Sequence, residues 1–73
     1  MKRLGEKLHT LRTRHGLTIR QLAPQLGVSD SYITQIELGK KTPSAKLVVK
    51  ISLFFQVPLD LLMRDDLELD IAS

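Results

Sequence analysis

The chain of 73 residues contains no cysteine, no tryptophan, two Phe and one Tyr. Without cysteine it can form neither a disulfide nor a cysteine-bound metal site. The aromatic side chains on which RNA-binding modules stack unpaired bases are scarce. The longest apolar run, residues 51–55, is interrupted by a serine, so the sequence shows no membrane span and no signal peptide. We therefore expect one small cytoplasmic domain with no membrane partner.

Residue patterns typical of catalysis are absent as well. The sequence has no paired carboxylates in a plausible pocket, no glycine-rich phosphate loop and no activated nucleophile. His9 and His15 are six residues apart, whereas two metal ligands on one helix face would be four apart. We expect no enzyme, no cofactor and no metal.

The charge is divided unevenly along the chain. Residues 1–50 hold ten Lys/Arg and three Asp/Glu, a balance of +7, whereas residues 51–73 hold one Arg and five Asp/Glu, a balance of −4. A basic surface backed by an acidic one is typical of nucleic-acid binding, although chance clustering in a short chain gives the same pattern.

Apolar spacing predicts a first helix over residues 2–15. Leu4, Leu8 and Leu11 recur at i, i+4 and i+7 and form a core stripe. Lys7 and Arg14 are expected on the solvated side of this helix.

Two short helices are predicted next, over residues 19–26 and 30–37. Thr18 and Gln21 form a capping box at the start of the first, and Gly27 ends it. Ser29 caps the second, which Gly39 ends. Pro24 lies inside the first helix and removes one of its backbone hydrogen bonds.

The second of these helices has one polar face. At 100° per residue, a set of mostly polar side chains falls within an arc of roughly 140°. Its members are Asp30, Ser31, Thr34, Gln35 and Leu38. Ile33 and Ile36 lie opposite, and the helix would be about 12 Å long, close to the width of a DNA major groove. Two helices joined by a glycine-containing turn, the second with such a face, describe a helix-turn-helix.

Residues 17–44 resemble the helix-turn-helix of phage repressors, the lambda repressor and Cro family. The likeness extends more weakly over residues 3–63. The matching residues are Leu17-Thr18, Leu22-Ala23, Leu26-Gly27-Val28-Ser29, Tyr32-Ile33, Gln35-Ile36-Glu37, Gly39-Lys40 and Pro43-Ser44. The resemblance implies an all-α, compact five-helix bundle that binds double-stranded DNA.

The resemblance implies base contacts from Asp30, Ser31 and Gln35, with Thr34 beside them. Gln35 can pair with adenine, and Asp30 can accept from the amine of a cytosine. Phosphates repel a carboxylate, so an equal alternative is that Asp30 makes no base contact. Its negative charge in the first turn would then stabilise the helix through the helix dipole.

Contacts to the DNA backbone are expected around this helix. The family's glutamine after the threonine is replaced by Ile19, so Thr18, Arg20 or backbone N–H groups would have to supply its phosphate contact. The other expected backbone contacts are Ser29, Tyr32, Lys40, Lys41 and Ser44. The alternative for the two lysines is a solvated loop.

The resemblance also implies an internal ion pair between Arg12 and Glu37, which would tie the first helix to the recognition helix. The alternative is two separate surface charges.

Further helices are predicted over residues 45–55 and after Pro58, the last with Leu59 and Leu62 facing inward. Residues 1–64 would form the DNA-binding domain and residues 65–73 an acidic and apolar tail. Strand, helix and disorder are all open for this tail. The rear of the domain is rich in apolar side chains, which suggests a dimer interface. The expected interface residues are Leu53, Phe54, Leu61, Leu67 and Leu69.

We expect a transcriptional regulator that binds an inverted repeat as a homodimer. Occupying a promoter is sufficient for repression, so we expect a repressor. The alternative is an antitoxin-type module that binds a partner protein and regulates its own synthesis through DNA.

Overall fold

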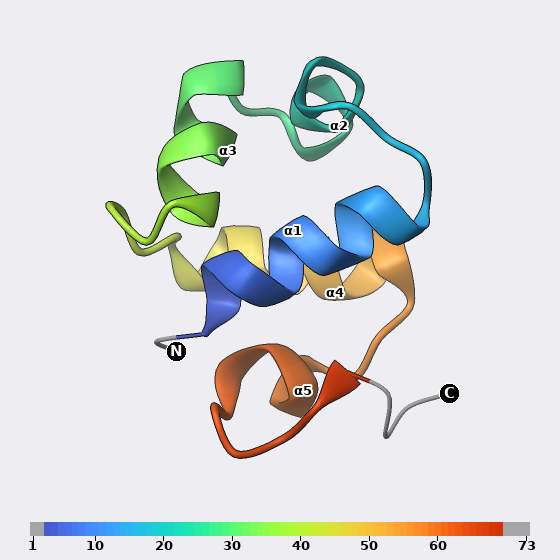
Figure 1. The fold of residues 1–73 in the computed structure, drawn as a ribbon, viewed down its shortest axis with the longest axis vertical. Helices are drawn as coiled ribbons and strands as arrows, with labels where there is room; N and C mark the ends of the chain where they lie inside the picture. Colours follow the sequence, from blue (N-terminus) through green and yellow to red (C-terminus); the bar gives the residue numbers. More distant parts are fainter. Residues whose placement is uncertain (1–2, 70–73) are drawn as a thin grey trace.

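The computed structural model describes residues 3–69, which fold into five helices (Figure 1). These residues contain no strand. The helices are α1 (Leu4–Arg14), α2 (Ile19–Leu26), α3 (Asp30–Glu37), α4 (Ala45–Phe55) and α5 (Leu59–Met63). The all-α, five-helix expectation is confirmed. None of the helices in the described part of the chain is long and apolar enough to cross a membrane.

The ends of α2 follow the chemistry of the sequence. The Thr18 hydroxyl accepts from the Gln21 N–H at 3.1 Å, and the Gln21 side chain accepts from the Thr18 N–H at 2.9 Å. Gly27 ends the helix with φ 71°, in the left-handed region where a Cβ is costly. The capping box is confirmed, and α2 continues through Pro24.

One hydrophobic core holds the helices together. α1 packs against α3 and α5, and α2 packs against α3 and α4. The core side chains are Leu4, Leu8, Leu11, Leu22, Ala23, Leu26, Ile33, Ile36, Leu47, Val48, Ile51, Phe55 and Leu62. This arrangement fixes α3 at one side of the molecule, beside α2 and across the N-terminal half of α1 (Figure 1).

Lys7 is not on the solvated side of α1, as the sequence suggested, but is 2% exposed. Its ammonium donates to the carbonyl of Leu61 and, at 2.6 Å, to that of Arg64. The expectation was wrong because α5 ends directly over this face of α1, and its last carbonyls need donors. Lys7 therefore joins the two helices.

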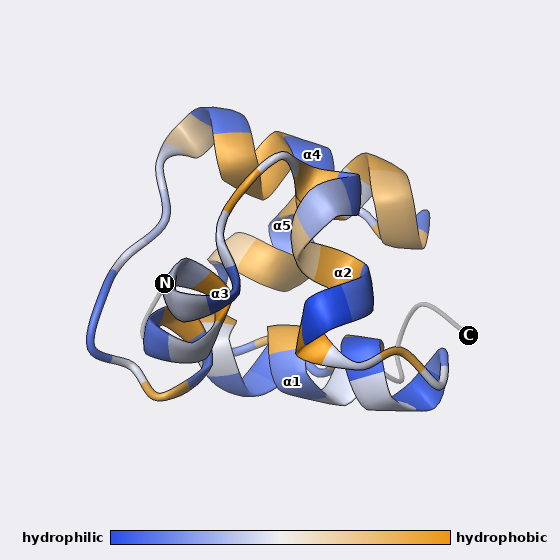
Figure 2. Cartoon of the chain, turned by 90° about the horizontal axis from the view of Figure 1, so that it is seen from above, coloured by the Kyte–Doolittle hydropathy of each residue, from blue (hydrophilic) through white to orange (hydrophobic). Residues whose placement is uncertain are grey.

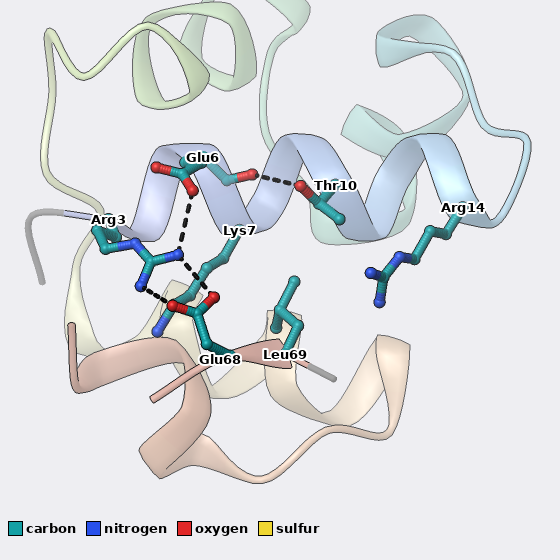
Figure 3. Close-up of a pocket in the computed structure, with 7 residues that line it drawn as sticks. All are labelled: Arg3, Glu6, Lys7, Thr10, Arg14, Glu68 and Leu69. Atoms are coloured by element: carbon teal, nitrogen blue, oxygen red, sulfur yellow. Dashed lines mark hydrogen bonds and ion pairs between the residues drawn. The ribbon is translucent and has the colours of Figure 1, made fainter. Parts of the chain in front are cut away.

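The segment after α5 returns to the start of α1. The Arg3 guanidinium binds both carboxylate oxygens of Glu68, at 2.8 and 3.0 Å, as Figure 3 shows. The Arg3 N–H donates to Asp65 Oδ1 at 2.9 Å. Residues 64–69 form no strand within this single chain, and residues 70–73 lie outside the described residues.

Candidate nucleic-acid interface

The outward face of α3 carries the polar arc that the sequence predicts. Asp30, Ser31 and Thr34 are exposed, and Gln35 is half-buried. Ile33 on the opposite side is fully buried in the core. This helix can therefore present side chains to a groove without giving up its packing.

Two hydrogen bonds organise this face. Gln35 Nε2 donates to Ser31 Oγ at 3.4 Å, and Thr34 Oγ1 donates to the Asp30 carbonyl at 3.0 Å. The carbonyl oxygen and second amide hydrogen of Gln35 have no partner among the described residues. An amide with one acceptor and one donor to offer can recognise an adenine edge.

Three hydroxyl groups expected at the DNA backbone serve as helix caps. Thr18, Ser29 and Ser44 begin α2, α3 and α4, and each hydroxyl oxygen accepts from the backbone N–H three residues later, at 3.1, 3.1 and 3.2 Å. The cap uses an acceptor lone pair, so each O–H proton remains available for a phosphate oxygen.

Some cations of the described chain pair with carboxylates, and others do not. Arg3, Arg12 and Arg64 pair with carboxylates at 2.7–2.8 Å. No carboxylate of the described chain forms an ion pair with the cations on α2, on α4 or in the loop after α3. These cations are Arg20, Lys40, Lys41, Lys46 and Lys50. Lys41 lies over the Tyr32 ring, 5.9 Å from its centroid. Unpaired cations around α3 form a surface that attracts polyanions.

An ion-pair network anchors the end of α3 to α1. Arg12 Nε lies 2.7 Å from Glu37 Oε2, and Arg12 Nη2 lies 3.1 Å from Glu37 Oε1. His9 Nδ1 is 2.9 Å from the same Oε1. The two paired side chains are 12% and 7% exposed. Burial opposes ionisation of Glu37, but the hydrogen bonds from Arg12 and His9 outweigh it and hold the pKa of this carboxyl below its usual value.

Comparison with known proteins places this arrangement in a family. A helix-turn-helix family model matches residues 8–62, which include most of α1, all of α2 to α4 and most of α5. The chain belongs to the lambda repressor/Cro-like helix-turn-helix family.

The relatives of this helix-turn-helix chain are transcriptional regulators. It is 46% identical over 57 residues to an uncharacterized regulator of Methanocaldococcus jannaschii, covering 78% of the chain and 86% of the relative. It is 44% identical over 62 residues to the transcriptional activator BcrR of Enterococcus faecalis, covering 85% of the chain and 30% of the relative. It is 38% identical over 64 residues to the transcriptional repressor RghR of Bacillus subtilis, covering 86% of the chain and 47% of the relative. The chain thus spans most of the archaeal relative and less than half of each of the other two.

Gly5 positions the helix-turn-helix, although no sequence pattern singled this residue out. A Cβ at this position would lie 2.1 Å from the Ile36 carbonyl oxygen, well inside contact distance. The missing side chain lets α1 approach the C-terminal end of α3. A glycine near the start of an otherwise regular helix was the only sign of this contact.

The expected dimer residues divide into two groups. Leu53 and Phe54 lie at the surface, Leu53 with 72% exposure. The expectation that Leu61 joins them was wrong: it is 4% exposed because α5 packs this side chain inward beside Leu62. Leu59, expected inward, is exposed instead.

The tail leucines, Leu67 and Leu69, are half-buried, and Leu69 packs against the domain's own core. The exposed large apolar side chains of α4 and α5 are Val49, Leu53, Phe54, Leu59 and Met63. We call this set the α4–α5 apolar face. The C-terminal half of α4 is coloured almost uniformly hydrophobic in Figure 2.

Proposed function

We propose that this chain regulates transcription by reading double-stranded DNA with α3. Asp30, Ser31, Thr34 and Gln35 would face base edges in the major groove. The observation that supports this is an outward polar face on a buried, capped helix, surrounded by cations without acidic partners. Arg20, Lys40 and Lys41, together with Tyr32 and the three cap hydroxyl groups, would contact the DNA backbone and fix the orientation of α3.

The proposed binding unit is a homodimer on an inverted-repeat operator. The α4–α5 apolar face supports it, because two consecutive helices that expose several large apolar side chains are typical of an interface. In such a dimer two copies of α3 would enter successive major grooves about 34–36 Å apart.

Selection from a random duplex library tests this proposal. We expect an enriched inverted repeat with half-site centres about 10–10.5 base pairs apart and affinity that falls steeply with salt. Enrichment of single half-sites would contradict the dimer, and no enrichment at all would contradict sequence-specific binding.

The dimer has its own test in sedimentation. Leu53→Glu should convert a dimer to a monomer because it places a carboxylate in the α4–α5 apolar face. Leu38→Glu is the matched control, because Leu38 is an exposed leucine that follows α3 and lies outside this face. A wild-type monomer at tens of micromolar would contradict the proposal.

Repression is proposed as the regulatory outcome because occupying a promoter is sufficient for it. The relatives include an activator and a repressor by name. A reporter gene with the selected operator overlapping its promoter should lose expression when the chain is present, and increased expression would contradict repression.

The α4–α5 apolar face also supports a second candidate, an antitoxin-type module whose face binds a partner protein. Purification from the native source would then yield a stoichiometric hetero-complex, and Leu53→Glu would release the partner. A homodimer recovered without another protein favours the first candidate.

A further inference from the structure

A small pocket lies where the turn between α2 and α3 meets the first two turns of α4. It has a volume of about 150 Å³, and its lining includes Gly27, Val28, Tyr32, Lys46 and Lys50. We call it the Lys46–Lys50 pocket. We propose that it binds one phosphate of the DNA backbone, beside the groove that α3 enters. The inference rests on the proposed function and adds two residues that the helix-turn-helix pattern does not select.

The charge of the pocket favours an anion. Lys46 and Lys50 are one helical turn apart, so they lie on the same face of α4. Neither forms an ion pair or hydrogen bond with any residue between 3 and 69. Like charges at this spacing repel each other and destabilise the helix, and a bound anion would relieve that repulsion.

The shape of the pocket brings both lysines toward α3. Lys50 Nζ lies 3.6 Å from the position that a Cβ on Gly27 would take, so this side chain reaches across to the turn before α3. Ser44, whose hydroxyl caps α4, also lines the pocket. The donors available to a phosphate oxygen are therefore two ammonium groups and one hydroxyl.

The pocket is continuous with the expected phosphate-contacting surface. Tyr32 forms one wall, and Lys41 lies over the same ring. At 100° per residue, Tyr32 is about 60° beyond Gln35 on α3, at the edge of the polar arc. A phosphate at the edge of the major groove would meet this side of α3, because the sugar-phosphate backbones border the groove that the arc enters.

The test is the salt dependence of binding to the selected operator and to a scrambled duplex. The variants are Lys46→Gln with Lys50→Gln, measured singly and together. Loss of one phosphate contact should reduce the slope of log K against log salt by about 0.9. At about 0.15 M salt this corresponds to roughly fivefold weaker binding. The loss should be equal on both duplexes, because a phosphate contact carries no base information.

Arg64→Gln is the matched control. It removes the same charge from a surface cation that already pairs with Asp66, on the side of α5. The control should leave the slope unchanged. Thermal unfolding should show that all variants are folded at the temperature of the binding experiment, because Lys46, Lys50 and Arg64 are exposed.

Each outcome decides one question. An unchanged slope in the folded double variant would overturn the pocket assignment while the wild-type protein still binds its operator. An equal change in Arg64→Gln would also overturn it, because the effect would then be one of net charge. Failure of the wild-type protein to bind either duplex would instead overturn the proposed function.

Discussion

Removing one partner of the Arg12–Glu37 pair should strongly destabilise this small domain. Glu37→Gln keeps the shape of the side chain but leaves the Arg12 guanidinium, 12% exposed, without its carboxylate. Breaking a buried pair in this way costs about 3–5 kcal/mol. Arg12 keeps its 2.8 Å bond to the Leu17 carbonyl, so we expect a value near 3 kcal/mol.

This loss is large for a domain of 73 residues. A change of 1 kcal/mol shifts Tm by about 4–8 °C in a domain of this size, so Glu37→Gln should lower Tm by more than about 10 °C. Circular dichroism during heating, together with urea unfolding, measures it. A loss below about 0.5 kcal/mol would refute the reasoning, because that is the value of an exposed pair.

Acid should have the same effect as the substitution. Since the folded protein holds the pKa of Glu37 below its usual value, the pair stabilises the fold above the unfolded pKa of about 4.3. This contribution is lost as the pH falls from there through the folded pKa. In Glu37→Gln this part of the acid dependence should be missing, and wild-type and variant profiles that run parallel below about pH 4.3 would contradict the assignment.

Three further substitutions test the packing by thermal unfolding. Gly5→Ala places a methyl group against the backbone of α3 and should cost about 1–3 kcal/mol; an unchanged Tm would show that α1 and α3 lie farther apart than described. Lys7→Met should cost about 1–3 kcal/mol for each carbonyl left without a donor, and a loss no larger than that of an exposed lysine would contradict its burial. Gln56→Gly should stabilise the domain by about 1 kcal/mol, because Gln56 ends α4 with φ 55°, and a decrease in stability would contradict this.

The sequence alone determined the local structure of this chain. Thr18 with Gln21, Ser29 and Ser44 set the starts of three helices, and Gly27 set the end of one. These signals are readable because capping depends on side chains within three residues of each other along the chain. The same holds for the polar arc of α3, which follows from helical periodicity.

Only the tertiary structure decided what each helix faces. α5 covers Lys7 and buries its own Leu61 side chain. α3 approaches α1 so closely that a side chain at Gly5 would collide with the α3 backbone. Such outcomes depend on contacts between residues more than thirty positions apart, which no local pattern encodes. The pairing of cations was decided in the same way: carboxylates reach Arg3, Arg12 and Arg64, whereas no acidic side chain among residues 3–69 forms an ion pair with Lys46 or Lys50.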